Sequence, residues 1–103
     1  METRTIAGKS VSFTEDGYMS DMHEWNEDIA KELAKEENIE LDDLHWKVLG
    51  FLREKQAAGV SLTIRSVGKS GIVDIKGFYT LFPGGPLKLS TKIAGLPKPA
   101  SCV

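Results

Sequence analysis

The sequence is poor in cysteine, with a single residue of this type among 103, at position 102. One cysteine cannot form an internal disulfide. A chain without disulfide bridges is typical of a protein from a reducing compartment. Because the only other soft metal ligands are two histidines, a metal site is not expected. We therefore expect a protein that folds on its hydrophobic core alone, with no metal and no cofactor.

Long hydrophobic runs are also missing. No stretch approaches the 18 or so apolar residues of a transmembrane helix, so we expect no membrane association. Residues 1–4 are not a basic segment followed by an apolar run, so we expect no signal peptide and a cytoplasmic location. The 41% hydrophobic and 27% charged residues are ordinary for a globular protein, and 103 residues suit a single domain.

Positive charge is scarce in the first half of the chain and negative charge in the second. Residues 1–58 hold 14 acidic against 7 basic residues, whereas residues 59–103 hold Asp74 alone against 6 basic residues. One interpretation is that the basic half meets an acidic partner, either a protein or a nucleic acid. The other is that two solvated helices happen to be acidic, and the sequence leaves both open.

Hydrophobic spacing predicts one hairpin followed by helices. Residues 5–13 alternate around a Gly8-Lys9 turn, with Ile6, Val11 and Phe13 on the inner face. Helical spacing follows in five segments, the first capped by Ser20 or Asp21 and the third by Ser61. The fourth has Ile72, Ile75, Tyr79 and Phe82 on one face. The predicted helices cover residues 21–35, 41–59, 61–67, 73–82 and 86–95. Trp25 and His45 lie on apolar stripes, so we assign both to structural roles.

These elements predict a mostly α fold: a small helical bundle with an N-terminal β-hairpin and an extended C-terminal arm. We expect residues 1–95 to form the single domain and residues 96–103 to form a mobile arm. Residues 61–82 also have the helix, turn, helix order of a helix-turn-helix, which would suit a DNA-binding protein. Against DNA binding, the net charge is −2 and the would-be recognition helix carries only Lys76 as a base.

The arm combines stiffness with the one thiol. Pro97 and Pro99 fix the backbone in an extended form, so the stretch from Gly95 to Cys102 can reach about 20 Å. Such an arm would present Cys102 to the active site of another protein. The alternative is that a cysteine near a chain end is incidental. Neither histidine is near Cys102 in sequence, which favours a carrier over a self-contained catalyst.

Several blocks of the sequence form a recognisable pattern: Phe82-Pro83-Gly84-Gly85-Pro86, Lys92-Ile93-Ala94-Gly95-Leu96-Pro97-Lys98-Pro99, Cys102-Val103, Asp16-Gly17-Tyr18, Trp25 and Leu44-His45-Trp46. With these blocks the chain resembles the DsrC/TusE family of sulfur-carrier proteins, and the resemblance covers most of the chain. It implies an orthogonal helical bundle with a helix-turn-helix and persulfide chemistry at Cys102. For such a carrier of the sulfurtransferase type, we expect Lys88, Lys92 and Lys98 to steer the arm into an acidic partner surface, with Pro97 and Pro99 also at the contact with the partner.

Two departures from the family pattern limit what the resemblance implies about the sulfur pathway and its partners. Members that serve dissimilatory sulfite reductase carry a second cysteine where this chain has Thr91, and they use both thiols to release sulfur. A single cysteine is the TusE-like pattern, which implies sulfur received from a TusBCD-type complex and passed to a tRNA thiouridylase, with nucleic acid involved only indirectly. The alternative is a carrier or regulator of dissimilatory sulfur metabolism. The second departure is the stretch 65–78, which is shorter than in many members of the family. No feature of the sequence requires an oligomer, so we expect a monomer.

Overall fold

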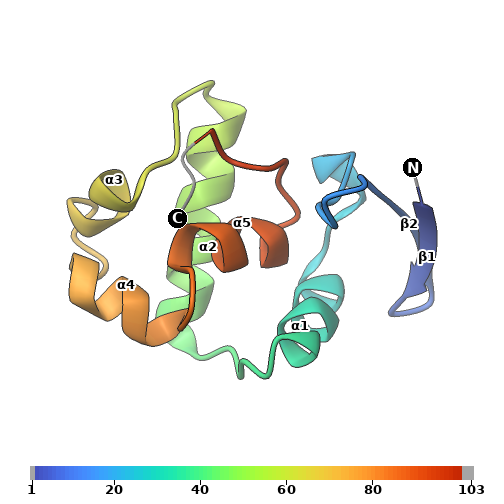
Figure 1. Ribbon diagram of the computed structural model, residues 1–103, viewed down its shortest axis with the longest axis horizontal. Coiled ribbons are helices and arrows are strands. Elements are labelled where there is room, and N and C mark those ends of the chain that lie inside the picture. The colour runs from blue at the N-terminus through green and yellow to red at the C-terminus, as the bar shows by residue number, and fades with distance from the viewer. Residues whose placement is uncertain (1, 101–103) are drawn as a thin grey trace.

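The structure, a computed structural model, describes residues 2–100. It confirms the predicted mostly α fold with an antiparallel N-terminal hairpin and five helices (Figure 1). The elements are β1 (Glu2–Ile6), β2 (Lys9–Phe13), the 3₁₀ helix η1 (Met22–Glu24), α1 (Glu27–Glu36), α2 (Asp43–Ala57), α3 (Ile64–Gly68), α4 (Ile75–Leu81) and α5 (Pro86–Ile93). Within this part of the chain, no helix is long and apolar enough to cross a membrane.

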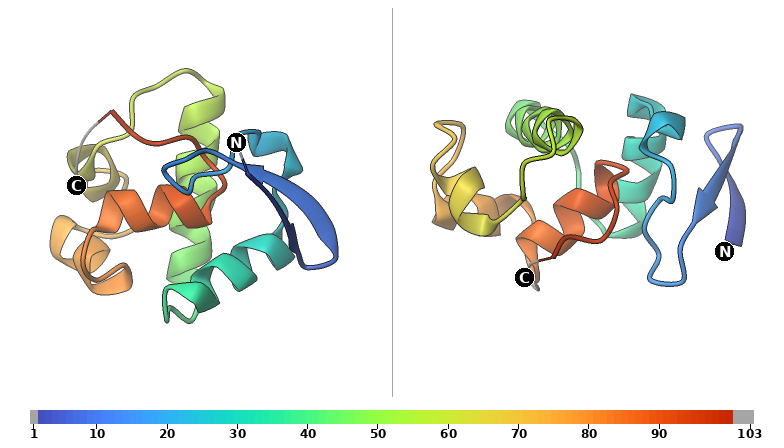
Figure 2. Two further views of the ribbon diagram at one scale, coloured as in Figure 1. Left: turned by 45° about the vertical axis from the view of Figure 1, so that its right-hand side comes forward. Right: turned by 90° about the horizontal axis from the view of Figure 1, so that it is seen from above.

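Helices α2 and α5 cross at the centre of the molecule. Helices α3 and α4 lie at one end, and α1 and the hairpin lie at the other (Figures 1 and 2). The core forms where the inner faces of α1, α2, α4 and α5 meet. Its large buried side chains include Ile29, Leu33, Val48, Leu49, Leu52, Phe78, Phe82, Leu87 and Ile93.

The hairpin is confirmed, but its turn lies one residue earlier than predicted. Ala7 and Gly8 have φ values of 52° and 76°, and Ile6 pairs with Lys9. Two central residues with positive φ are what a tight two-residue hairpin turn requires. Val11 and Phe13 on β2 are buried, so the hairpin closes over the bundle as a covering element.

The first predicted helix starts later than the sequence pattern indicated. Asp21 caps only the short η1, and Asn26 then caps α1 by accepting a hydrogen bond from the Ile29 backbone N–H at 2.9 Å. Between them, Trp25 is in an extended conformation with ψ 145°. The pattern placed Trp25 on a continuous helix, whereas the chain breaks there and turns its indole towards α5.

Two predictions for the next helices are wrong. Thr63, not Ser61, caps α3, and Thr63 and Ser66 form a capping box. On α4, Ile75 and Tyr79 are 47% and 45% exposed instead of facing inward. The inner stripe is Phe78 and Phe82, whose rings pack edge to face at 5.8 Å, because this larger pair fills the space beside α2.

His45 has the structural role that the sequence predicted. Its Nε2 donates a hydrogen bond to the Leu81 carbonyl oxygen at 2.8 Å, and its Nδ1 is part of the capping box with Asp42 at the start of α2. Hydrogen bonds from the His45 backbone and side chain lower the pKa of the Asp42 carboxyl. The histidine therefore joins the beginning of α2 to the end of α4.

Candidate functional site

The candidate nucleophile, Cys102, lies outside the described residues. The structure does describe the chain that leads to it, from the end of α5 to Ala100. We call residues 93–96 the arm root and residues 97–100 the described arm. The arm root fixes the point at which the arm leaves the bundle.

Helix α5 ends in a Schellman motif. The Leu96 backbone N–H donates to the Thr91 carbonyl at 3.0 Å, and the Gly95 N–H donates to the Lys92 carbonyl at 3.2 Å. Gly95 supplies the left-handed residue, with φ +72°, that this motif needs. Leu96 is buried directly after the turn, so the arm root is packed into the bundle rather than frayed.

The indole of Trp25 holds the arm root from the side of η1. Its Nε1 donates to the Ile93 carbonyl oxygen at 2.8 Å. A Cβ atom at position 95 would lie only 2.4 Å from Cδ1 of the same ring. The position therefore requires glycine for two reasons, its backbone conformation and its contact with Trp25. The family block quoted above includes both residues, but nothing in the sequence places them together.

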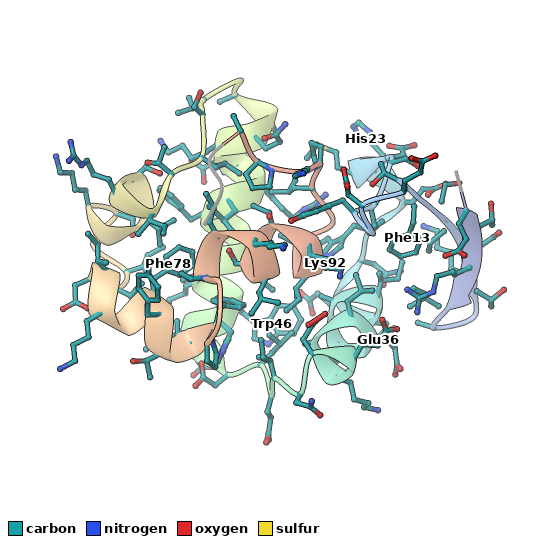
Figure 3. All side chains as sticks on the ribbon, in the orientation of Figure 1. Phe13, His23, Glu36, Trp46, Phe78 and Lys92 are labelled. Atoms are coloured by element: carbon teal, nitrogen blue, oxygen red, sulfur yellow. The ribbon has the colours of Figure 1, made fainter. Side chains whose placement is uncertain are left out.

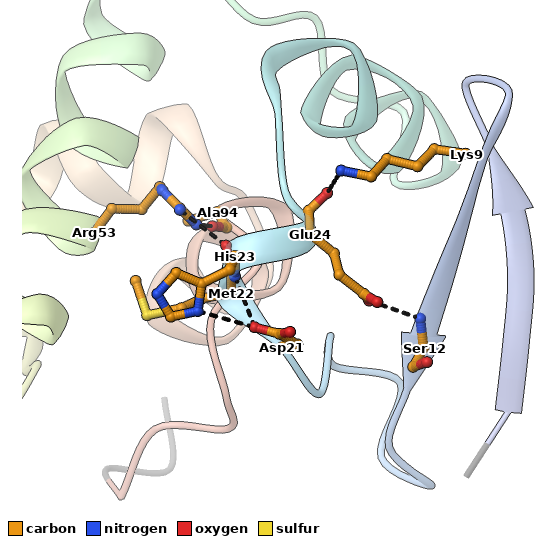
Figure 4. A network of polar contacts seen from close by, with 8 residues as sticks. All are labelled: Lys9, Ser12, Asp21, Met22, His23, Glu24, Arg53 and Ala94. Atoms are coloured by element: carbon orange, nitrogen blue, oxygen red, sulfur yellow. Dashed lines mark hydrogen bonds and ion pairs between the residues drawn. The ribbon is translucent and has the colours of Figure 1, made fainter.

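Arg53 of α2 also holds the arm root. Its guanidinium donates to the Ala94 carbonyl at 2.8 Å and to the Met22 carbonyl at 2.9 Å (Figure 4). It also stacks over the Trp25 ring at 4.2 Å. Burial lowers the pKa of Arg53, although an arginine remains charged at neutral pH. One side chain thus joins α2, η1 and the arm root.

The sequence analysis missed Arg53. The available signal was its place four residues after Leu49, on the inward face of α2, where a charged residue needs partners. The hairpin connects to the same network. Glu24 of η1 accepts a hydrogen bond from the Ser12 backbone N–H, and its carbonyl accepts one from Lys9 Nζ (Figure 4).

The described arm lies against the connection between α2 and α3. Together they border a hollow of about 280 Å³ whose lining includes Gln56, Val60, Leu62, Pro97 and Ala100. Pro97 and Lys98 are exposed and Pro99 is partly buried there. The mobility of the arm stays a prediction.

The three predicted partner-binding lysines have different surroundings. Lys88 is exposed on α5. Lys92 faces α1, where its Nζ lies 3.6 Å from Glu37 Oε1 (Figure 3). Lys98 Nζ lies 3.9 Å from Asp16 Oδ2, with both groups mostly exposed. Lys92 therefore helps to hold α5 against α1, and Lys88 and Lys98 present charge to solvent. Their roles in partner binding stay predictions.

The position where some family members carry a second cysteine is inside the bundle. Thr91 is fully buried, and its hydroxyl donates to the Leu87 carbonyl at 2.7 Å. Tyr18 is buried nearby; burial and the Asp16 carboxylate raise the pKa of its phenol, and a hydrogen bond with Thr91 opposes this. The chain therefore has a hydroxyl where a two-thiol mechanism needs its second sulfur.

A second hollow, of about 570 Å³, lies between α1 and the start of α2. It shares no lining residue with the hollow beside the arm. Within residues 2–100 there is also no group of three or more histidine, cysteine, aspartate or glutamate side chains that would hold a metal.

Replacing Arg53 by methionine should lower the free energy of unfolding by about 2–3 kcal/mol, because two partly buried carbonyls lose their charged donor. Urea unfolding measures this. Lys47→Met is the matched control, since Lys47 is exposed on the same helix, and it should change the free energy by less than about 0.5 kcal/mol. Equal effects of the two substitutions would contradict the assigned role of Arg53.

Comparison with known proteins identifies relatives over nearly the whole chain. Residues 5–103 match the family described as "DsrC like protein". The sequence is 42% identical to the "Sulfurtransferase TusE homolog" of Haemophilus influenzae, covering 95% of this chain and 97% of that protein. It is 36% identical to "Sulfurtransferase TusE" of Salmonella typhimurium, covering 93% and 95%.

Solved structures show the same fold. The solution structure of Allochromatium vinosum DsrC matches with a TM-score of 0.83 and 35% identity over 99% of this chain and 98% of that one. The oxidized γ-subunit of the dissimilatory sulfite reductase (DsrC) from Archaeoglobus fulgidus matches with a TM-score of 0.84 and 36% identity over 99% and 100%. At these identities the likeness extends beyond the fold to the sequence.

Proposed function

Since this chain belongs to the DsrC-like protein family and is a sulfur-relay protein, we propose that Cys102 is the residue that carries the sulfur. It is the only thiol in the chain. The observation that carries the proposal is the arm root, where Trp25, Arg53 and Gly95 fix the departure of a proline-stiffened arm that leads to this thiol. A fixed root followed by an arm is what presentation to a second protein requires.

The proposed chemistry is two successive thiol exchanges. The Cys102 thiolate attacks the outer sulfur of a donor persulfide, a new S–S bond forms, and the donor leaves as a thiolate. Cys102 then carries a persulfide. In the second step an acceptor thiolate attacks the outer sulfur and releases the Cys102 thiolate. No external oxidant or reductant is needed, because each step breaks one S–S bond and forms another.

For the pathway, we propose tRNA thiolation, with a TusBCD-type complex as the donor and a tRNA thiouridylase as the acceptor. The supporting observations are the TusE names of relatives at 36–42% identity and the single thiol. Thr91 supports the same assignment, because release of sulfur through an intramolecular disulfide needs a second cysteine. The arm would pass sulfur on without leaving a disulfide behind.

The second candidate is an association with dissimilatory sulfite reductase. It is favoured by the likeness to the γ-subunit of that enzyme, with a TM-score of 0.84. In this alternative the protein would bind sulfite reductase as a carrier or regulator. The buried hydroxyl of Thr91 would then limit it to steps that use one thiol.

Deleting the gene should reduce 2-thiouridine in tRNA to background, because the relay would lack its carrier. Mass spectrometry of digested tRNA measures this, and the wild-type gene should restore the nucleoside whereas the gene carrying Cys102→Ser should not. Unchanged 2-thiouridine in the deletion strain would contradict the tRNA assignment. Co-purification of the wild-type protein with sulfite reductase from the strain that carries its gene would then favour the second candidate.

A further inference from the structure

Unpaired positive charge gathers on one end of the molecule. Within residues 2–100, four exposed cations have neither a hydrogen bond nor an ion pair with another side chain and lie on or beside helices α3 to α5: Arg65, Lys69, Lys76 and Lys88. Elsewhere on the described chain several cations are already engaged, as Arg4 is with Glu36, although Lys31 and Lys47 are also exposed without a side-chain partner. Arg65, Lys69, Lys76 and Lys88 are therefore available to a partner, whereas Lys92 of α5 is paired with Glu37.

Negative charge gathers on the opposite end. Helix α1 and its connection to α2 carry an excess of carboxylates over Lys31 and Lys35: Glu27, Asp28, Glu32, Glu36, Glu37, Glu40 and Asp42. Figures 1 and 2 show α1 and the α3–α4 pair at opposite ends of the bundle. The charge asymmetry of the sequence is thus a separation in space, which would orient the molecule as it approaches a charged partner.

Apolar surface lies among the unpaired cations. Ile75 and Tyr79, one turn apart on α4, are 47% and 45% exposed. Ile75 packs on the end of α3, since a Cβ atom at Gly68 would lie 2.6 Å from its side chain. The two helices therefore share one outer surface. We call Arg65, Lys69, Ile75, Lys76 and Tyr79 the α3–α4 surface.

The described arm approaches this surface. Ser61 and Leu62, which lead directly to the Thr63 cap of α3, border the hollow that Pro97 to Ala100 also line. A protein that reaches past the described arm for Cys102 would therefore meet the beginning of α3. The described arm lies beside the connection that leads into α3, whereas α1 lies at the other end of the molecule from α3 and α4 (Figure 1).

We propose that the α3–α4 surface docks an acidic surface of the protein that exchanges sulfur with Cys102. This inference rests on the proposed relay function. An apolar centre containing a tyrosine, with cations around it, has the composition of a protein–protein contact. Nucleic-acid binding would call for a stronger basic footprint than these three cations on a chain of net charge −2.

The test compares two charge-matched variants in sulfur loading. Arg65→Gln, Lys69→Gln and Lys76→Gln remove the charge of the surface, and Lys31→Gln, Lys35→Gln and Lys47→Gln remove the same charge elsewhere. Loading is followed by intact mass with two donors: sodium polysulfide and a purified, persulfidated TusBCD-type complex. Urea unfolding of both variants checks that the fold is retained.

With the protein donor, the surface variant should load about 10-fold more slowly at low salt, and the difference should shrink below about 2-fold at high salt, because steering by exposed charge is screened. The control variant should match the wild type, and polysulfide should load all three alike. Tyr79→Ser should slow loading by the protein donor at both salt concentrations, because its contribution is apolar.

Equal rates for the surface variant and the control with the protein donor would overturn the inference. Loading of the wild type by polysulfide but not by the complex would also overturn the inference, although the carrier function would stand. A surface variant that loses affinity for tRNA in fluorescence anisotropy but loads normally would assign the surface to nucleic acid instead. Failure of polysulfide and complex alike to load the wild type would contradict the proposed function itself.

Discussion

Cys102→Ser should take up no sulfur from any donor and should pass none to an acceptor. A serine hydroxyl is not ionised at neutral pH and cannot form the S–S bond on which exchange depends. Since the chain has no other cysteine, no second thiol can substitute. Intact-mass measurement after incubation with a persulfide donor should therefore show the mass of the unmodified variant, with an unfolding curve like that of the wild type.

A matched variant separates the presence of a thiol from its position. Ser101→Cys combined with Cys102→Ser keeps one thiol on the arm but moves it by one residue. Polysulfide should still load it, whereas a protein donor should load it at least about 10-fold more slowly, because exchange inside a partner's site depends on orientation. Full loading of Cys102→Ser, or equal loading of the shifted thiol by the protein donor, would contradict the assigned role of Cys102.

The second large effect is expected at the arm root. Gly95→Ala should lower the free energy of unfolding by about 2–4 kcal/mol, because it combines an unfavourable backbone conformation with a steric clash. The new Cβ would lie 2.4 Å from Trp25 Cδ1 and 2.8 Å from Trp25 Cβ. Either the indole or the arm must then move, and the Schellman motif or the hydrogen bond from Trp25 to Ile93 is lost.

Gly84→Ala is the control that isolates the clash. Gly84 also has a positive φ, +96°, but a Cβ there would have no neighbour within 4 Å. It should therefore cost only about 1 kcal/mol, the backbone part of the effect. Urea unfolding of both variants measures the difference. Equal destabilisation would mean that Trp25 does not hold the arm root.

The elements of the fold were predictable because local rules govern them. Helical spacing located all five helices, and alternation located the hairpin. The errors arose where long-range contacts override those rules. Trp25 has helical spacing with Ile29, yet the chain breaks there, and its indole donates to a carbonyl 68 residues away. On α4, the pairs Ile75–Tyr79 and Phe78–Phe82 have the same helical spacing, so spacing alone could not identify the inner face. The aromatic pair is the buried one, because it packs beside His45.

The chemistry of the candidate site was predictable from the sequence, whereas the residues that hold the arm root were not. The single cysteine and the two prolines are visible in the sequence, and the family resemblance gave their meaning. The arm root depends on Trp25, Arg53 and Gly95, which three different elements or turns supply. No spacing rule joins residues so far apart. The pairing of Lys92 with Glu37 was likewise outside the reach of the sequence.

The central claim is that this protein carries sulfur on Cys102, and one measurement tests it most directly. The purified protein is incubated with a persulfide donor, separated from it, and analysed by intact mass and by mass mapping of its peptides. The account predicts a gain of about 32 Da, one sulfur atom, on the peptide that contains Cys102, removed completely by reductant. No gain with any donor, or a gain confined to other peptides, would contradict it.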